Sequence, residues 1–287
     1  MYRRIVAGTD LSSTAKVATD RAANLAGRLD AELTLVHAGS DPGEELERQG
    51  EEYGAEVVVT AGSPADVLIS ETDRLNADLL VVGSVGMRGA RRFLLGSVPN
   101  KVSHHAGTDL LIVKTDPPPK AVADYAGIVV GTDGSPTAAK AVKAACGLAT
   151  RLGIKPVVVC AYEPLTEQEL KRLRADPNDP VDQWNAPKVA KTTPEEFRWR
   201  IVDAARAQDV LERAEKLASD EGVDVDVRAI EGNPAEVLIS LAENDDSIDV
   251  IAVGSVGMTG TKRFMLGNVP HRVSHHASTD VLILHTA

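Results

Sequence analysis

Short runs of consecutive apolar residues alternate with longer segments in which apolar residues recur every three or four positions. In the first half the apolar runs lie at 4–8, 32–37, 56–60, 77–82 and 109–114, and they predict strands. Helices are predicted at 13–29, at 41–53, from the dipeptide Ser63-Pro64 onward, and at 97–106. Runs such as LTLVH and LLVVG lack polar alternation, which is typical of parallel strands covered on both faces. The order predicts a doubly wound α/β unit of five parallel strands and about four helices.

The second half of the chain repeats this order. Residues 254–286 align with 83–115 without a gap and share about two-thirds of their residues, 128–141 match 5–18, and 231–240 match 61–70. The repeat predicts tandem domains at 1–116 and 127–287, joined by a proline-rich linker at 117–126. Only the second domain carries the extra stretch 163–197, for which a lid, a docking element or a plain surface loop are all open.

Composition narrows the class of protein. The 287 residues carry a formal net charge of −11, which argues against a general nucleic-acid binder and against an anionic membrane surface as partner. The two cysteines, Cys146 and Cys160, lie in predicted core elements without metal-binding spacing, as expected for small buried hydrophobes in a reducing compartment. No stretch approaches a membrane span or a secretion signal, so we expect a cytoplasmic protein.

A glycine-spaced loop follows the fourth predicted strand and precedes a helix. Its spacing is G-x2-G-x9-G-S, and the first copy consists of Gly83, Gly86, Gly96, Ser97 and Val98, with Arg88 inside the span. Glycine exposes backbone N–H groups, and a helix start adds N–H groups and a positive dipole end, so the pattern favours a phosphate site. The second copy is Gly254, Gly257, Gly267, Asn268 and Val269, in which asparagine replaces serine. The alternative is a loop that glycine merely allows to turn tightly.

An aspartate ends the first strand of each half. Asp10 and Asp133 could accept ribose hydroxyls or hold a metal that bridges phosphates. Helix capping by these aspartates, or by Ser12 and Ser135, is the alternative. The two turns differ because Leu11 stands where the second half has Gly134.

Other candidate motifs favour structure or are missing. The pairs 104–105 and 275–276 are adjacent histidines, whose side chains point in different directions on a helix, so we expect a structural role and no metal site. The sequence lacks a G-x-S-x-G elbow, a Walker loop and the dinucleotide fingerprint. The third predicted strand does not end in the aspartate that a response-regulator receiver would need.

Several segments of this chain resemble those of the universal stress protein family, in the tandem form of its ATP-binding branch. They are IVAGTD, IVVGTDGSPTA, the glycine loop, and the final strands LLIVK and VLILH. The resemblance covers nearly the whole chain. The resemblance implies two Rossmann-like domains, each with ATP across the strand ends and Mg²⁺ bound with it. Adenine would lie near the end of the second strand, and ribose and phosphates near the first. The residues that this implies, besides the glycine loops, are Gly8, Asp10, Val36, His37, Ala38, Gly131, Asp133, Val159, Cys160 and Ala161.

Three functions follow as hypotheses. The first is an ATP-binding regulator of the stress response and dormancy with little or slow hydrolysis, because the glycine loop holds no convincing general base. The second is a magnesium-dependent ATPase or nucleotidyl transferase. The third is a nucleotide-free interaction module. We further expect a homodimer and an unidentified protein partner, with final strands that pair across domains.

Overall fold

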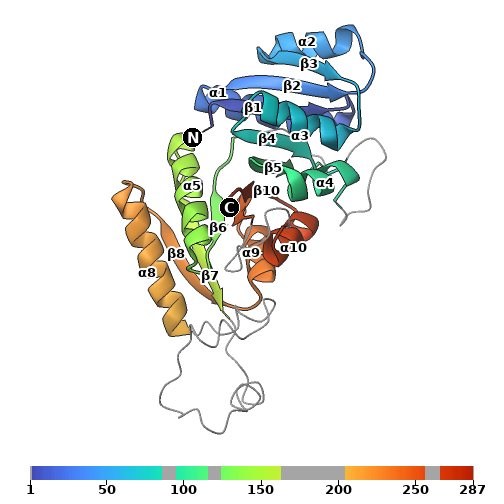
Figure 1. Ribbon diagram of the computed structural model, residues 1–287. Coiled ribbons are helices and arrows are strands. Elements are labelled where there is room, and N and C mark those ends of the chain that lie inside the picture. The colour runs from blue at the N-terminus through green and yellow to red at the C-terminus, as the bar shows by residue number, and fades with distance from the viewer. Residues whose placement is uncertain (1, 86–94, 116–123, 163–203, 256–265, 287) are drawn as a thin grey trace.

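The computed structural model describes residues 2–85, 95–115, 124–162, 204–255 and 266–286. Within them the chain forms a single ten-stranded sheet in the order β3-β2-β1-β4-β5-β10-β9-β6-β7-β8 (Figure 1). Every neighbouring pair is parallel except β5 and β10, which are antiparallel. Two five-stranded parallel sheets, one from each half, therefore meet edge to edge.

The elements of the first half agree with the predicted ones to within a few residues. They are β1 (Arg4–Thr9), α1 (Ser13–Leu29), β2 (Glu32–Ala38), α2 (Glu44–Tyr53), β3 (Glu56–Thr60), α3 (Pro64–Arg74), β4 (Leu79–Gly83), α4 (Ser97–His105) and β5 (Asp109–Val113). The predicted fold class, doubly wound α/β in two tandem Rossmann-like units, is confirmed by this order and by its repetition.

The second half repeats the same succession over its described residues. Its elements are β6 (Ile128–Gly131), α5 (Pro136–Leu152), β7 (Pro156–Tyr162), α8 (Ala204–Asp220), β8 (Asp226–Glu231), α9 (Pro234–Asn244), β9 (Val250–Gly254), α10 (Asn268–His276) and β10 (Asp280–Leu284). The 163–197 stretch and most of the 117–126 linker lie outside the described residues, so the domain boundaries remain predictions.

Local sequence signals explain where the helices begin. Ser12 and Ser135 are N-caps whose side chains accept from the amides of Ala15 and Ala138. Proline occupies the first turn of α3, α5 and α9, where its missing N–H costs little. Ser63 stands at the N-cap position of α3, but its side chain makes no capping hydrogen bond, whereas its counterpart Asn233 caps α9.

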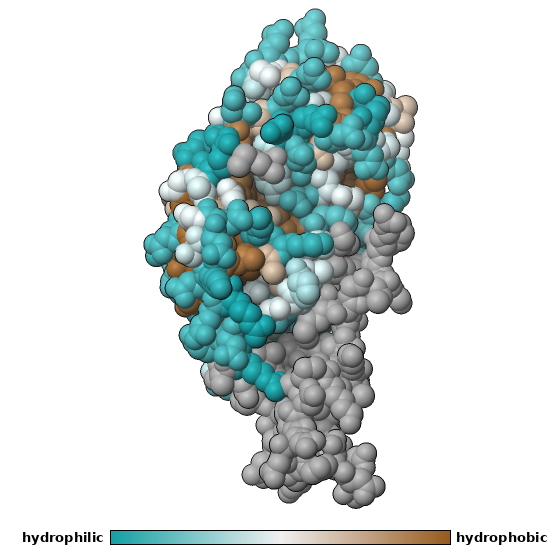
Figure 2. Space-filling view, turned by 60° about the vertical axis from the view of Figure 1, so that its left-hand side comes forward, coloured by the Kyte–Doolittle hydropathy of each residue, from teal (hydrophilic) through white to brown (hydrophobic). Residues whose placement is uncertain are grey.

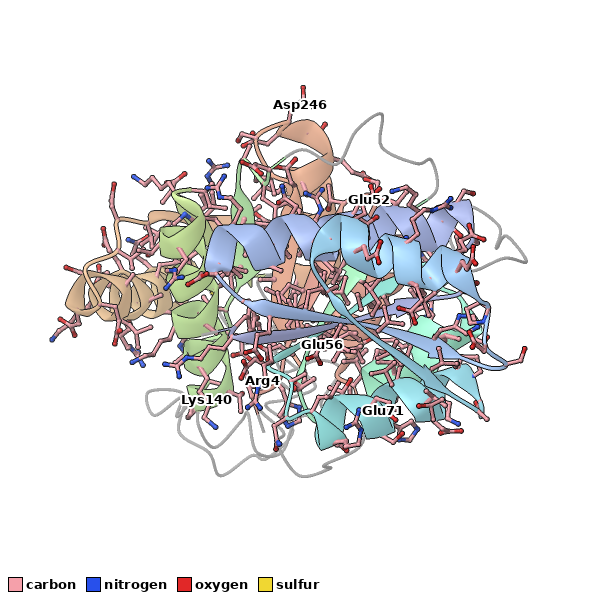
Figure 3. All side chains as sticks on the ribbon, turned by 90° about the horizontal axis from the view of Figure 1, so that it is seen from above. Arg4, Glu52, Glu56, Glu71, Lys140 and Asp246 are labelled. Atoms are coloured by element: carbon pink, nitrogen blue, oxygen red, sulfur yellow. The ribbon has the colours of Figure 1, made fainter. Side chains whose placement is uncertain are left out.

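Helices cover both faces of the sheet, as the continuous apolar runs predicted. One hydrophobic cluster joins the sheet to α1, α2, α5 and α8, and a second joins the opposite face to α3, α4, α9 and α10. The outer faces of the helices are polar, and exposed side chains such as Glu52 and Lys140 project outward (Figure 3). On the face shown in Figure 2, hydrophilic side chains cover most of the described surface.

The junction of the two halves is pseudo-symmetric. In the β5–β10 pair, Leu111 lies opposite Leu282, its own counterpart in the repeat. Beside the sheet, α1 and α5 cap each other: Arg28 donates to the Leu152 carbonyl (2.6 Å) and Arg151 donates to the Leu29 carbonyl (2.8 Å). The prediction that final strands pair between domains is therefore confirmed within one chain. No helix among the described residues is long and apolar enough to cross a membrane.

Candidate functional site

The candidate site lies where the strand order of each half reverses. From β1 the chain proceeds outward through β2 to β3 and then returns to β4 on the other side of β1. Adjacent β1 and β4 therefore send their following segments to opposite faces, which opens a crevice at their carboxyl ends. In the second half β6 and β9 hold the equivalent places.

The turn between β1 and α1 is held by a chain of side-chain oxygens. Asp10 Oδ1 accepts from the Ser12 amide (3.1 Å) and the Ser12 hydroxyl (2.5 Å). The Thr14 hydroxyl lies 3.0 Å from the Ser12 hydroxyl, and Thr9 Oγ1 accepts from the Leu11 amide (3.1 Å). The capping residue is Ser12, so the role of Asp10 in the described contacts is to orient that serine.

The second half rebuilds this turn. Asp133 Oδ1 accepts from the Ser135 amide (2.9 Å), the Ser135 and Thr137 hydroxyls are 2.9 Å apart, and Thr132 Oγ1 accepts from the Gly134 amide (3.2 Å). Sequence reasoning named Ser12 and Ser135 as helix caps, which is confirmed, but it missed the threonines of the two turns. The pattern G-T-D-x-S-x-T, present as GTDLSST and GTDGSPT, could have identified them.

The glycine loop is closed at its base by backbone hydrogen bonds. The Gly96 amide donates to the Ser84 carbonyl (2.8 Å), and the Gly267 amide donates to the Ser255 carbonyl (2.9 Å). The span between these anchors contains Gly86, Arg88 and Gly257, which lie outside the described residues. Each loop thus leaves β4 or β9 and returns to the same point, directly before α4 or α10.

The helices that follow the loops begin without a side-chain cap. Gly96 and Gly267 are the N-caps of α4 and α10, and glycine has no side chain to satisfy the first N–H groups. The first residue of each helix, Ser97 or Asn268, is exposed, and the second, Val98 or Val269, is half-buried. Their orphan N–H groups and the positive end of the helix dipole favour an anion at this point.

Several of the predicted glycines also have a packing reason. A Cβ on Gly8 or Gly131 would come within 2.9 Å of the side chain of Leu68 or Leu238, so these glycines let α3 and α9 approach the sheet. By contrast, a Cβ on Gly83 or Gly254 would make only ordinary van der Waals contacts, the nearest at 3.4 Å. Close packing alone therefore explains Gly8 and Gly131.

The residues predicted to lie near adenine differ in exposure. The side chains of Val36, Val159 and Cys160 are 1% exposed and belong to the core. A ligand would therefore meet these three through the backbone. His37, Ala38 and Ala161 are half-buried, and His37 Nδ1 lies 3.0 Å from the Thr9 carbonyl oxygen.

Both cysteines are buried and free, as expected. Burial, with a smaller contribution from the Asp133 charge, raises the pKa of Cys160 to about 12, and burial raises the pKa of Cys146 to about 11. Both thiols therefore stay protonated at neutral pH, which leaves little thiolate for nucleophilic chemistry or metal binding.

The oxygen atoms of the β1–α1 turn suit a magnesium ion that arrives with a nucleotide. Carboxylates and hydroxyls are hard ligands, and Mg²⁺ is commonly held by one or two carboxylates together with phosphates. Within the described ranges no three histidine, cysteine, aspartate or glutamate side chains gather as a metal-binding group. The residues thus fit a phosphate-borne ion better than a site made by protein ligands alone.

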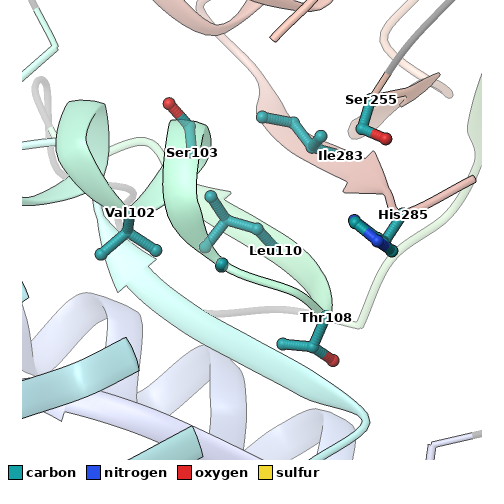
Figure 4. Close-up of a pocket in the computed structure, with 8 residues that line it drawn as sticks. Val102, Ser103, Thr108, Leu110, Ser255, Ile283 and His285 are labelled. Carbon is teal, nitrogen blue, oxygen red and sulfur yellow. The ribbon is translucent and has the colours of Figure 1, made fainter. Parts of the chain in front are cut away.

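A small pocket lies at the junction of the halves and is separate from the site described above. Among its lining residues are Ser103 and Leu110 from the first half and Ser255, Ile283 and His285 from the second (Figure 4). It has room for roughly one water molecule, which excludes a nucleotide as its occupant.

The sequence profile of the universal stress protein family matches residues 1–56, 41–114 and 125–285. The chain belongs to the universal stress protein family. It is 31% identical over 163 residues to universal stress protein Rv1636 of Mycobacterium tuberculosis, a match that covers 56% of this chain and 97% of that protein. It is 27% identical over 233 residues to universal stress protein Rv2005c of the same species, covering 80% of this chain and 68% of that protein.

A solved structure has the same fold as this universal stress protein over nearly its whole length. A universal stress protein from Archaeoglobus fulgidus DSM 4304 superposes with a TM-score of 0.64 at 17% identity, covering 99% of this chain and 98% of that one. A universal stress protein solved in complex with cAMP is 31% identical to this chain and covers 57% of it over 100% of its own length, with a TM-score of 0.39.

Proposed function

We propose that this universal stress protein binds ATP at the carboxyl ends of β1 and β4, and again at β6 and β9, as a stress-response regulator with little or slow hydrolysis. The observation that carries the proposal is the uncapped start of α4 and α10 at the two switch points, each anchored to the preceding strand through Ser84 or Ser255. Backbone N–H groups in this position are donors for which a polyphosphate is a fitting acceptor.

Different residues of each half would bind different parts of the ligand. In the first half, Ser97 and Val98 would hold phosphate oxygens, and Asp10 would hold ribose hydroxyls or the Mg²⁺ that accompanies the phosphates. Asn268, Val269 and Asp133 have the same places in the second half. Bound nucleotide and its ion would supply the phosphate charge at this point, and the chain's own groups would bind and orient the ligand.

Equilibrium binding of ATP with Mg²⁺ to the purified chain tests this proposal. We expect two sites per chain. Asp10→Ala should weaken the first site by about tenfold or more, since a hydrogen bond to a charged group contributes about 1.5–3 kcal/mol. Asp133→Ala should do the same to the second site. Asp224→Ala is the matched control. Asp224 pairs with Lys155 at the surface and lies just before β8, at the amino end of that strand and not at the carboxyl ends where the site lies.

A parallel titration with cAMP separates the nucleotides, since one relative was solved with cAMP. Stronger binding of cAMP than of ATP would overturn the choice of ATP, and no binding of either at millimolar concentration would leave the interaction-module hypothesis. Fast magnesium-dependent turnover that Asp10→Ala abolishes would instead support the ATPase hypothesis. We keep the expected cytoplasmic location, homodimer and protein partner as proposals alongside this function.

A further inference from the structure

Three imidazoles from both halves of the chain meet on the face of the sheet that carries α4 and α10. The rings of His271 and His275, one turn apart on α10, are stacked with centroids 4.2 Å apart and planes inclined by 29°. The ring of His104 on α4 lies 6.1 Å from that of His271. His104 and His275 are counterparts in the repeat, so the group lies close to the axis that relates the halves.

We propose that His104, His271 and His275 form a pH-sensitive contact between the two halves, which is favourable when the rings are neutral and weakens when they gain protons. Neutral imidazoles can pack at these distances. Imidazolium ions at these distances repel each other, and the repulsion between His104 and His271, 6.1 Å apart, acts across the junction. The proposal concerns this junction alone and does not depend on nucleotide binding.

The surrounding charges offer little compensation for added protons. The charged and titratable groups on the packed elements are Lys101 and His105 on α4, Arg272 and His276 on α10, Asp66, Glu71, Asp73 and Arg74 on α3, Glu236 and Glu243 on α9, and Asp109, Lys114, Asp280 and His285 on or next to β5 and β10. Of the carboxylates, Asp66 pairs with Lys101 and Glu236 with Arg272, each at 2.7 Å, and Glu71 pairs with Arg74 at 2.6 Å. The Lys114 ammonium donates to the Ser274 carbonyl of α10 (2.7 Å) and adds further positive charge.

The environment favours the neutral rings in the folded chain. Burial, and then the charges of His105 and His275, lower the pKa of His104. Burial, and then the charges of His275, His104 and His276, lower the pKa of His271. A histidine whose pKa is lower when folded binds fewer protons than in the unfolded chain. Folding stability is therefore highest above the ordinary histidine pKa of about 6.5 and is lost as the pH falls below it.

A direct test is an NMR titration of the imidazoles in the full chain. We expect His104 and His271 to titrate below about 6.5. His104→Asn removes the ring that faces α10 from the first half and should move the pKa of His271 upward, because the His104 charge is one of the causes that lower it. An unchanged titration of His271 in this variant would show that the rings do not interact across the junction, and would overturn the proposal.

A second test measures the junction itself. Between about pH 7.5 and about pH 5.5 the unfolding midpoint of the wild-type chain should fall by about 3 °C more than that of His271→Asn. His37→Asn, at the end of β2 and away from the contact between α4 and α10, is the control and should lose as much stability as the wild type. Equal losses in wild type and His271→Asn would contradict the proposal.

Amide hydrogen exchange shows which part of the sheet is destabilised at low pH. Once intrinsic rates are corrected for pH, acidification should speed exchange in the β5–β10 ladder more than in the β1–β2 ladder, which lies away from the junction. A uniform change across both ladders would assign the pH effect to the whole fold and not to the contact between the halves.

Discussion

The two sides of the junction carry the same contacts but differ in one buried charge. Tyr2 donates to Asp109 (2.8 Å) and Tyr125 donates to Asp280 (2.6 Å), and each aspartate also accepts one backbone amide from the other half. Among the described residues, Asp280 and not Asp109 has a cation within salt-bridge distance: Arg21 forms an ion pair with it at 3.2 Å and lies 3.9 Å above the Tyr125 ring. The two halves therefore keep the hydrogen bonds of the tyrosines and amides, and they differ at Arg21.

The position equivalent to Arg21 is Ala144, which is exposed. Burial raises the pKa of both Asp109 and Asp280, and the Arg21 charge opposes this effect at Asp280. A duplicated junction can thus acquire a charged partner on one side while the hydrogen bonds to both aspartates are kept. What the comparison teaches is that removal of equivalent residues should have unequal effects.

The largest expected difference is between Asp280→Ala and Asp109→Ala. The first change leaves the buried Arg21 guanidinium without its carboxylate and should cost about 3–5 kcal/mol of unfolding free energy. The second removes hydrogen bonds from a phenol and an amide and should cost about 1–3 kcal/mol. Urea denaturation of both variants measures the difference, and equal costs would refute the assigned role of Arg21.

Lys114 should make the stability of the folded chain depend on pH in a way that its counterpart in the other half does not. Burial, partly opposed by the Asp280 charge, lowers its pKa to about 8, whereas the equivalent residue is the exposed His285. Between about pH 8 and about pH 10.5 the unfolded chain keeps a proton that the folded chain has released, so stability should rise with pH, by at most about 3 kcal/mol.

Lys114→Met should remove this rise, which urea denaturation across the pH range can measure against the wild type. His285→Met is the control at the equivalent position and should leave the rise intact. If the wild type and Lys114→Met gain the same stability over this interval, Lys114 is not the group responsible.

In the turn after the first strand of each half, Leu11 and Gly134 can each be replaced by the residue that the other half has. Leu11 and Gly134 both have positive φ, 61° and 75°, although leucine rarely adopts this conformation. Gly134→Leu should cost about 2 kcal/mol, because the new Cβ would meet Val210 Cγ2 at 2.7 Å in a strained backbone.

The reverse change, Leu11→Gly, relieves strain but removes apolar packing against the core cluster and should alter stability by less than about 1 kcal/mol. Thermal unfolding of the two variants checks the asymmetry. Equal destabilisation would mean that Val210 yields easily.

The smallest effect is expected at the junction pocket. Lys114 reaches the Ser274 carbonyl on one side, while on the other side His285 lines a pocket beside Ser103, the counterpart of Ser274. His285→Lys should donate to the Ser103 carbonyl and raise the unfolding free energy by less than about 1 kcal/mol, which is the scale of one net hydrogen bond. His285→Met fills space without donating, so an equal gain in both variants would assign the effect to packing.

Most of the fold could be predicted from the sequence because its signals are local and occur twice. Apolar runs located the strands, and serine, proline and glycine located the helix ends. The contacts around Asp280 could not be predicted, since Arg21 lies far from it in sequence and has no counterpart in the repeat. The recurrence of Tyr2 as Tyr125 and of Asp109 as Asp280 was the available signal.

The candidate site was predictable to a lesser degree. The strand ends, the aspartate turn and the glycine loop base follow from topology and turn chemistry, which are properties of short segments. Side-chain burial at Val36, Val159 and Cys160 depends on which helix covers each face, and a strand sequence without polar alternation does not reveal it.

The antiparallel pairing of β5 with β10 has a geometric consequence for ligands. Parallel strands within each half open their carboxyl ends on one side, and reversal at the central pair turns the two openings away from each other. One small molecule cannot bridge both openings, so each would fill without steric competition from the other. Among the described residues, any influence of one on the other would cross the junction, through the ladder of Leu110, Leu111 and Ile112 with β10 and through the side-chain contacts on either face of it.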